Sequence, residues 1–166
     1  MKIRKLLVCR SKKSGFTLYD FMLWLVAAAI TLVGVIALYN TASAWSKESQ
    51  TVQAVTALKA GAEKVKVGNH ASTTLAKVCD VRRNAVSMNI CGTSRNGVAM
   101  NPYGGNYTLT PNSANLSQVI IGVTRVDTKY IDNLADALAK LSVGNCIEAS
   151  GCTAITVSGS TITVIM

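Results

Sequence analysis

The longest apolar stretch of the chain lies near its start. From Phe16 to Tyr39 the sequence runs for 24 residues with Asp20 as its only charged residue. As an α-helix this stretch is roughly 36 Å long, more than the roughly 30 Å of a bilayer's hydrocarbon core. The pattern therefore predicts a helix that can span a membrane with some tilt.

Beyond Tyr39 the helix is predicted to continue with a different pattern. The chain has no proline before Pro102. From Trp45 onward apolar residues recur at near-helical spacing and polar residues fill the other faces; the apolar positions are Val52, Val55, Leu58, Ala62 and Val65. Gly68 and Asn69 supply a C-terminal stop. We expect this amphipathic half to pack against a sheet.

Short strand-like runs follow Gly68, with one more helix among them. Strands are predicted at four stretches: Asn106 to Thr110, Gln118 to Thr124, Ala154 to Val157 and Thr161 to Ile165. The second is apolar enough to lie in the middle of a sheet, and the Ser-Gly-Ser sequence around Gly159 indicates a hairpin between the last two. Asp127 is the expected N-cap of a helix that ends before Gly144, with an apolar face formed by Ile131, Leu134, Leu138 and Leu141. The predicted fold class is α+β, a long N-terminal helix packed on an antiparallel sheet.

Positive charge is concentrated before the apolar run. Of the formal net charge of +9, six positive charges precede Phe16, which leaves +3 for the rest of the chain. A basic segment beside a spanning helix is typical of the cytoplasmic side of a membrane, so the excess charge gives little support to nucleic-acid binding by the whole fold. Arg82, Arg83 and Arg95 remain as either a dedicated polyanion patch or a solvated surface.

Asp20 needs an explanation of its own. An ionised acid within a bilayer costs about 2.5–3.5 kcal/mol, less near the interface, so we expect it to have a partner or a purpose. A cleaved secretory signal is one alternative, because Ala42-Ser43-Ala44 fits a cleavage site; its apolar region would be only about 7–15 residues long. A plain signal anchor explains the basic flank and leaves Asp20 unexplained.

The residues from Ser14 to Asp20, SGFTLYD, resemble the processing site of type IV prepilins. In that family a basic leader ends in Gly, a membrane peptidase cuts after that Gly, and an acid is the fifth residue of the mature chain. The resemblance implies cleavage between Gly15 and Phe16 and methylation of the new amino terminus. The amine of Phe16 on one subunit can then neutralise Asp20 on its neighbour as the helices pack into a filament, so that the acid specifies register.

The motif departs from the family pattern in two ways. The family's usual acid is Glu, and Asp is one methylene shorter, so the geometry of the charge pair must differ. Tyr19 is also unusual beside that acid. The long leader favours the type IVb branch, whereas Phe16 as first mature residue is more typical of type IVa; type IVb is the preferred assignment.

The resemblance implies the organisation, partners and location of the protein. Residues 1–15 would be a cleaved leader, 16–44 a transmembrane and assembly helix, and 45–166 an α+β pilin head. The expected function is that of a structural subunit of a type IV pilus used for adhesion, conjugation or motility. Expected partners are identical subunits in a helical homopolymer, the prepilin peptidase, the inner-membrane assembly platform, and a host or recipient-cell surface. We expect the protein in the bacterial inner membrane before assembly and in an extracellular pilus afterwards.

Two alternatives stay open. A minor pilin or a type II secretion pseudopilin would share the processing motif. A membrane-anchored module that binds a ligand or DNA would share the anchor alone.

Cysteine usage agrees with export. Cys9 lies in the leader, which leaves Cys79, Cys91, Cys146 and Cys152, an even number suited to disulfides in an oxidising compartment. Of the three possible connectivities we favour Cys79–Cys91 with Cys146–Cys152, because each pair flanks a short, turn-rich segment. Zinc is the competing interpretation, but neither pair has the spacing of a metal knuckle.

The sequence offers no catalytic motif. His70 is the only histidine, and as a general base it would need a nucleophile and an orienting acid. No phosphate loop or metal motif occurs. We therefore expect a protein that is not an enzyme and that has no cofactor and no metal.

Overall fold

The computed structural model describes residues 17–166. The chain divides into two compact units, Met1–Thr41 and Ala42–Met166, and each is described by itself. Helix α1 (Leu18–Val65) is 48 residues long and belongs to both units. It contains no proline, and its glycines are Gly34 and Gly61, so the sequence has little that would break a helix interior.

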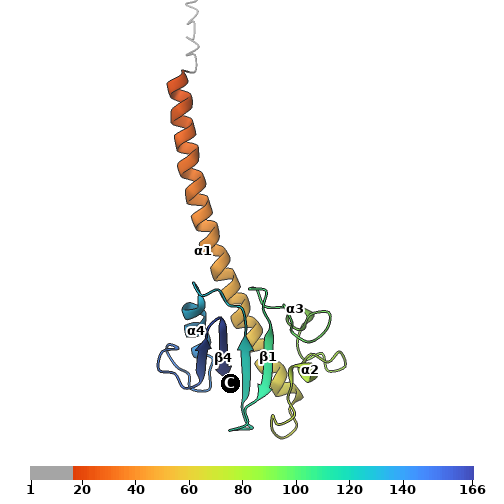
Figure 1. Cartoon of the computed structure of the whole chain (residues 1–166). Coiled ribbons are helices and arrows are strands. Elements are labelled where there is room, and N and C mark those ends of the chain that lie inside the picture. The colour runs from red at the N-terminus through yellow and green to blue at the C-terminus, as the bar shows by residue number, and fades with distance from the viewer. Residues whose placement is uncertain (1–16) are drawn as a thin grey trace, which may run out of the picture. The chain divides into compact units, whose positions relative to one another are not determined.

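The second unit is an α+β head built around a four-stranded sheet. Its strands are β1 (Tyr107–Pro111), β2 (Val119–Val123), β3 (Ile155–Ser158) and β4 (Thr161–Ile165). All neighbouring pairs are antiparallel, and the strand order is β1-β2-β4-β3. The predicted strands are therefore confirmed to within a residue at each end, β2 lies inside the sheet as predicted, and β3 and β4 form the predicted hairpin (Figure 1).

One face of the sheet and one face of α1 share the core of the head. A single row of paired residues crosses the four strands on the buried face: Leu109, Ile121, Val164 and Ile155. From α1 the core takes residues spaced three or four apart: Ala54, Val55, Leu58, Ala62 and Val65. The amphipathic spacing read from the sequence thus places this half of the helix on the sheet.

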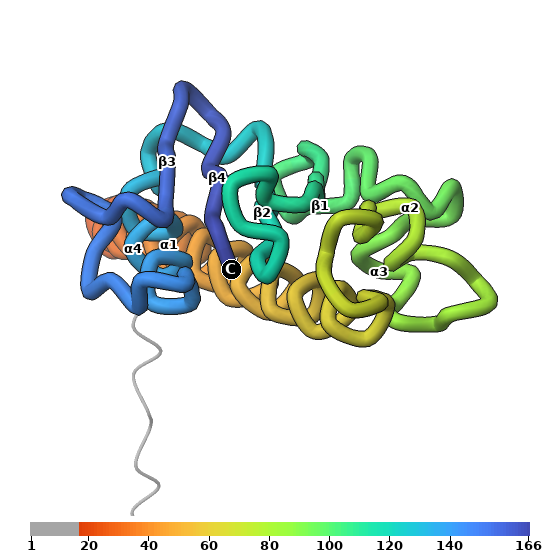
Figure 2. Tube along the Cα trace, turned by 90° about the horizontal axis from the view of Figure 1, so that it is seen from below, coloured from red at the N-terminus to blue at the C-terminus, as the bar shows by residue number. Residues whose placement is uncertain are grey.

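Three shorter helices flank the sheet. Helices α2 (Leu75–Val78) and α3 (Met88–Cys91) precede β1, and α4 (Ile131–Ala139) lies between β2 and β3 in the chain. Seen along the head in Figure 2, α4 lies at the end near β3 and β4, while α2 and α3 lie at the opposite end, beyond β1. The two ends of the head therefore come from different parts of the sequence.

The predicted N-cap of α4 is wrong. The residue that caps α4 is Tyr130, and the helix begins at Ile131. Asp127 instead starts a separate turn, in which its Oδ1 accepts a hydrogen bond from the Lys129 N–H at 3.0 Å and its carbonyl accepts one from Tyr130 at 2.9 Å. An Asp side chain serves a turn as readily as a helix start, which is why the sequence pattern did not distinguish the two.

Candidate membrane and assembly segment

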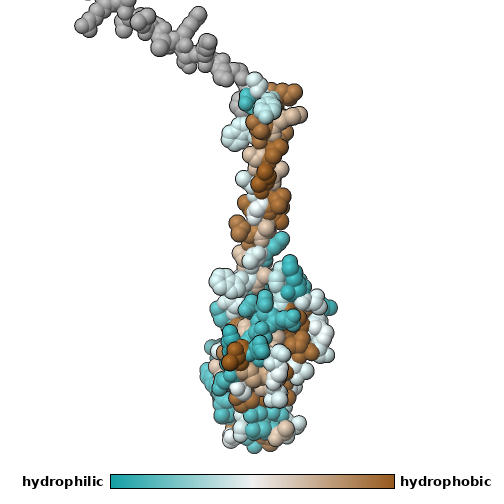
Figure 3. All heavy atoms as spheres, turned by 90° about the vertical axis from the view of Figure 1, so that its left-hand side faces the viewer, coloured by the Kyte–Doolittle hydropathy of each residue, from teal (hydrophilic) through white to brown (hydrophobic). Residues whose placement is uncertain are grey.

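The part of α1 in the first unit is apolar on all sides. Its large apolar side chains, from Leu18 to Tyr39, are each more than half exposed, and Figure 3 shows brown, hydrophobic side chains along this segment. A surface helix of a soluble domain would have a polar face. The helix is long and apolar enough to cross a membrane, as predicted.

Two tyrosines mark the ends of this segment. Tyr19 and Tyr39 are both largely exposed, and their separation of 20 positions corresponds to about 30 Å of helix, the thickness of a hydrocarbon core. Tyrosine is enriched at both membrane–water interfaces. A helix placed with one tyrosine at each interface would hold Asp20 at the interface level, where a charge costs much less than at the centre.

The two threonine hydroxyls within the segment have partners on their own helix. Thr31 Oγ1 donates to the Ala28 carbonyl at 2.8 Å, and Thr41 Oγ1 donates to the Ala37 carbonyl at 3.1 Å. Such bonds leave neither threonine hydroxyl in need of water, which suits a lipid environment. A methyl group added at Gly34 would meet no atom of the described residues within 4 Å apart from the adjoining backbone of its own helix, so no packing contact among these residues requires glycine there.

Thr17 and Asp20 form a capping box at the start of α1. The Thr17 Oγ1 donates to Asp20 Oδ2 at 2.7 Å and the Thr17 N–H donates to the same oxygen at 3.1 Å, while the Asp20 N–H donates to Thr17 Oγ1 at 3.3 Å. These bonds satisfy backbone N–H groups that the helix cannot pair. The carboxylate also lies at the positive end of the helix dipole.

The capping role of Thr17 is not among the sequence predictions, although the sequence contains a signal for it. Thr17-x-x-Asp20 is the capping-box pattern with Asp in the place of Glu. Gly15 and Phe16, the predicted processing residues, lie outside the described residues, together with the basic leader and Cys9. The predicted pair of Asp20 with the amine of a neighbouring Phe16 therefore stays a prediction, as does methylation.

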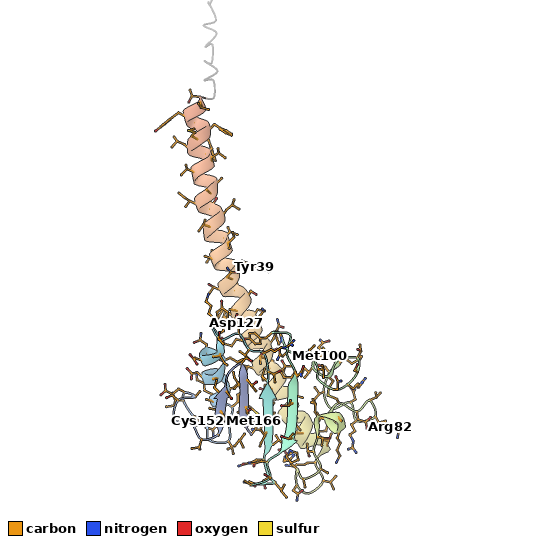
Figure 4. All side chains as sticks on the ribbon, in the orientation of Figure 1. Tyr39, Arg82, Met100, Asp127, Cys152 and Met166 are labelled. Carbon is orange, nitrogen blue, oxygen red and sulfur yellow. A yellow bond between two sulfur atoms is a disulfide. The ribbon has the colours of Figure 1, made fainter. Side chains whose placement is uncertain are left out.

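The head contains the two disulfides that the spacing favours. Cys79 and Cys91 are bonded with their Cα atoms 5.6 Å apart, and Cys146 and Cys152 with theirs 5.9 Å apart. The first disulfide is fully buried and joins the end of α2 to α3. The second closes a short loop between α4 and β3 (Figure 4, near the label of Cys152).

The three arginines singled out from the sequence differ in exposure and in hydrogen bonding. Arg82 and Arg83 are exposed at the tip of the loop that the first disulfide closes. Arg95 is half-buried, and its Nη1 donates to the Cys79 carbonyl at 3.2 Å. Arg95 therefore holds the base of the loop, and only the other two guanidinium groups are presented to solvent.

His70 is a structural residue at the end of α1. Its side chain is buried, with Nε2 3.1 Å from Glu63 Oε1 and Nδ1 3.3 Å from Thr73 Oγ1. Its backbone N–H donates a hydrogen bond to the Leu116 carbonyl at 2.8 Å. Glu63 also pairs with Lys66. Hydrogen bonding from the Lys66 ammonium, and to a lesser degree from the His70 ring, holds the pKa of Glu63 below its usual value. These contacts tie the last turn of α1 to the two loops beside it.

A hollow of about 520 Å³ lies in the head between α1 and the loop that carries α3. Its lining is uncharged and includes the side chains of Gln50, Gln53, Asn89 and the buried Tyr107. Burial raises the pKa of Tyr107 to about 12, so its hydroxyl stays protonated at neutral pH. The hollow therefore offers hydrogen bonds and apolar contacts, and its lining supplies no charged group.

No family model, no curated protein and no solved structure matches this chain. Within the described residues there is also no group of three or more His, Cys, Asp or Glu side chains placed to hold a metal ion.

Proposed function

We propose that the protein is a type IV pilin subunit, made as a prepilin that is cut after Gly15 and assembled through α1 into a filament. The observation that carries the proposal is that helix α1 combines two different halves. The first half is apolar on all sides and has Asp20 in its first turn, and the second half packs on an antiparallel sheet in a disulfide-linked head. A filament gives the exposed apolar half neighbours of its own kind once it leaves the bilayer.

The position of Asp20 supports this assignment. A capping box requires only a neutral or charged acceptor at its fourth position, and Asn or Gln would serve a cap without the cost of a charge near lipid. The choice of an acid is explained if the carboxylate also neutralises the amine that cleavage creates at Phe16 of the next subunit. The one-methylene difference from Glu is then accommodated by closer approach of the helices.

The secretory-signal alternative is weaker for a structural reason. Helix α1 continues without interruption through Ala42, Ser43 and Ala44. A cut after Ala44 would fall inside this helix and would separate its apolar half from the half that packs on the sheet. Processing at Gly15 leaves the whole helix and its Thr17–Asp20 cap in place.

Mass spectrometry of the mature chain tests the proposed processing. The wild-type protein should begin at a methylated Phe16. Gly15→Val should keep the leader, because the side chain does not fit a peptidase site shaped for glycine, whereas Gly15→Ala, which adds one methyl group, should be cut more slowly than wild type. A wild-type chain that begins at Trp45, or a Gly15→Val chain that begins at Phe16, would contradict the proposal.

The protein composition of sheared surface filaments, measured by gel electrophoresis and mass spectrometry, separates the pilin subtypes. A major pilin should be the most abundant protein of the sheared filaments. A minor pilin or a secretion pseudopilin would be processed in the same way but would be scarce in that material or absent from it.

A further inference from the structure

The charges of the described chain are separated along the sequence and along the head. Residues 59–95 contain seven basic and two acidic residues, a net charge of +5. The other described residues, 17–58 and 96–166, contain four basic and six acidic residues, a net charge of −2. A net basic segment in an otherwise acidic described chain indicates a surface for a negatively charged partner.

The segment forms one corner of the head, built from the end of α1, from α2 and from the disulfide loop. A methyl group added at Gly61 of α1 would lie 2.4 Å from Val86 Cγ2 and 2.8 Å from Val78 Cγ1, so the backbone of the helix approaches the loop closely. Lys64 Nζ donates to the Asn84 carbonyl at 3.4 Å. We call this surface the basic corner, and its cations are Lys64, Lys77, Arg82 and Arg83, with Arg95 at the base of the loop.

The backbone holds the two arginines at the tip of the corner. The Asp80 Oδ1 accepts a hydrogen bond from the Arg82 N–H at 2.9 Å, and the Asp80 carbonyl accepts bonds from the N–H groups of Arg83 and Asn84, both at 3.1 Å. Asn84 has a positive φ of 42°, as tight turns require. In this part of the head, Arg82 and Arg83 make no side-chain hydrogen bond or ion pair with any described residue, so their guanidinium groups are available to a partner.

We propose that the basic corner binds the phosphate backbone of double-stranded DNA without selecting bases. Arginine is suited to phosphate because its planar donors can bind two oxygens at once. The sequence from 59 to 102 contains no Phe, Tyr or Trp, so the corner has no aromatic platform on which unpaired bases could stack. It also has no aromatic anchor of the kind that seats a protein at a membrane interface. Binding by this surface requires neither cleavage at Gly15 nor assembly of filaments.

The test is fluorescence anisotropy with the full-length chain in neutral detergent micelles. The probe is a labelled mixed-sequence duplex of about 20 base pairs, roughly two turns, with the corresponding single strand as comparator. Arg82→Gln/Arg83→Gln is compared with Lys129→Gln/Lys140→Gln, which removes the same charge at the α4 end of the head, far from the label of Arg82 in Figure 4. All variants carry the same basic leader, so a difference in affinity between the two variants comes from the head.

We expect the arginine variant to raise the dissociation constant by roughly tenfold and to reduce the number of phosphates inferred from the salt dependence by about 2. The lysine variant should bind like wild type. Equal weakening in both variants, an unchanged affinity in the arginine variant, or tighter binding to the single strand would overturn the proposal. Binding to phosphatidylglycerol-containing vesicles without binding to duplex would identify a membrane partner and overturn it as well.

Discussion

Asp20 serves its own helix as well as the proposed subunit contact, and substitutions can separate the two roles. Asp20→Ala removes both the cap and the charge. Asp20→Asn keeps an oxygen that accepts from Thr17 but removes the charge. Loss of a cap costs about 0.5–2 kcal/mol, whereas an amine buried without its counter-charge costs about 3–5 kcal/mol. We therefore expect both variants to lose filaments, with processed subunit accumulating in the inner membrane, and Asp20→Glu to be milder.

The readouts for the Asp20 series are electron microscopy of sheared material and immunoblots of membrane fractions. Thr17→Val is the control, because it removes the capping hydroxyl and keeps the charge. It should retain filaments. Normal piliation in Asp20→Asn would mean that assembly does not require the charge.

Glu63 should make the stability of the head depend on pH. Its pKa is lowered, chiefly by Lys66 and also by His70, so its carboxylate contributes stability above the ordinary glutamate pKa of about 4.3, and that stability is lost as pH falls through the lowered value. The side chain is nearly half exposed, so the contribution is small. Thermal unfolding should show Glu63→Gln slightly less stable than wild type at pH 7 and equal to it near pH 3.

The matched control for Glu63 is Glu148→Gln, on the exposed loop between α4 and β3. This variant should follow the wild type at both pH values. A constant difference between wild type and Glu63→Gln across the pH range would mean that the carboxylate's ionisation does not stabilise the head.

At the scale of elements, the sequence predicts the features that have a periodic pattern and does not predict those that depend on contacts between distant residues. Helix α1 and the four strands each have a repeat that sequence can express. The order β1-β2-β4-β3 depends on which strands meet, and no local pattern encodes that. Helices α2 and α3 have four residues each, about one turn, which is too short for a helical period.

Among the residues of the candidate site, those with a local signal in the sequence were predictable, and those whose role depends on a distant contact were not. Asp20 was identified because an acid in an apolar run violates a local rule, and Arg82 and Arg83 because two adjacent cations are visible in the sequence. The structural role of Arg95 depends on the Cys79 carbonyl, 16 residues away in the chain, and could not be read from the sequence. The capping role of Thr17 could have been predicted from the sequence, since its spacing to Asp20 is a local signal.

The contact between α1 and the disulfide loop should make Gly61 intolerant of substitution. Alanine is about 1 kcal/mol better than glycine in a helix interior, so Gly61→Ala would stabilise an isolated helix. Here its Cβ would lie 2.4 Å from a methyl group of Val86, and overpacking of this kind costs about 1–3 kcal/mol. We expect net destabilisation of the head, measured by chemical denaturation.

Gly34→Ala is the control for Gly61, because the same change in the same helix meets no described atom within 4 Å beyond the adjoining helix backbone. It should leave the stability of the head unchanged. A Gly61→Ala protein as stable as wild type would mean that the loop yields at this point, and would weaken the account of how the basic corner is held together.

At the scale of the whole molecule, the two units should respond independently to change. Processing at Gly15 concerns residues of the first unit, whereas both disulfides lie in the second. Helix α1 is the one element that belongs to both. Loss of stability in the head should therefore leave removal of the leader unaffected.

Removing each disulfide tests this independence and ranks the two bonds. A disulfide stabilises mainly by restricting the unfolded chain, and more so for a longer loop; separations of 12 and 6 residues correspond to roughly 3 and 2 kcal/mol. Cys79→Ala/Cys91→Ala also removes buried sulfur atoms from the core, so it should destabilise the head more than Cys146→Ala/Cys152→Ala. Denaturation of each variant gives the ranking, and mass spectrometry should find the mature chain starting at Phe16 in both. If the shorter loop proved the more stabilising, the ranking would be wrong. If either variant kept its leader, the separation of folding in the head from processing at the helix start would be wrong.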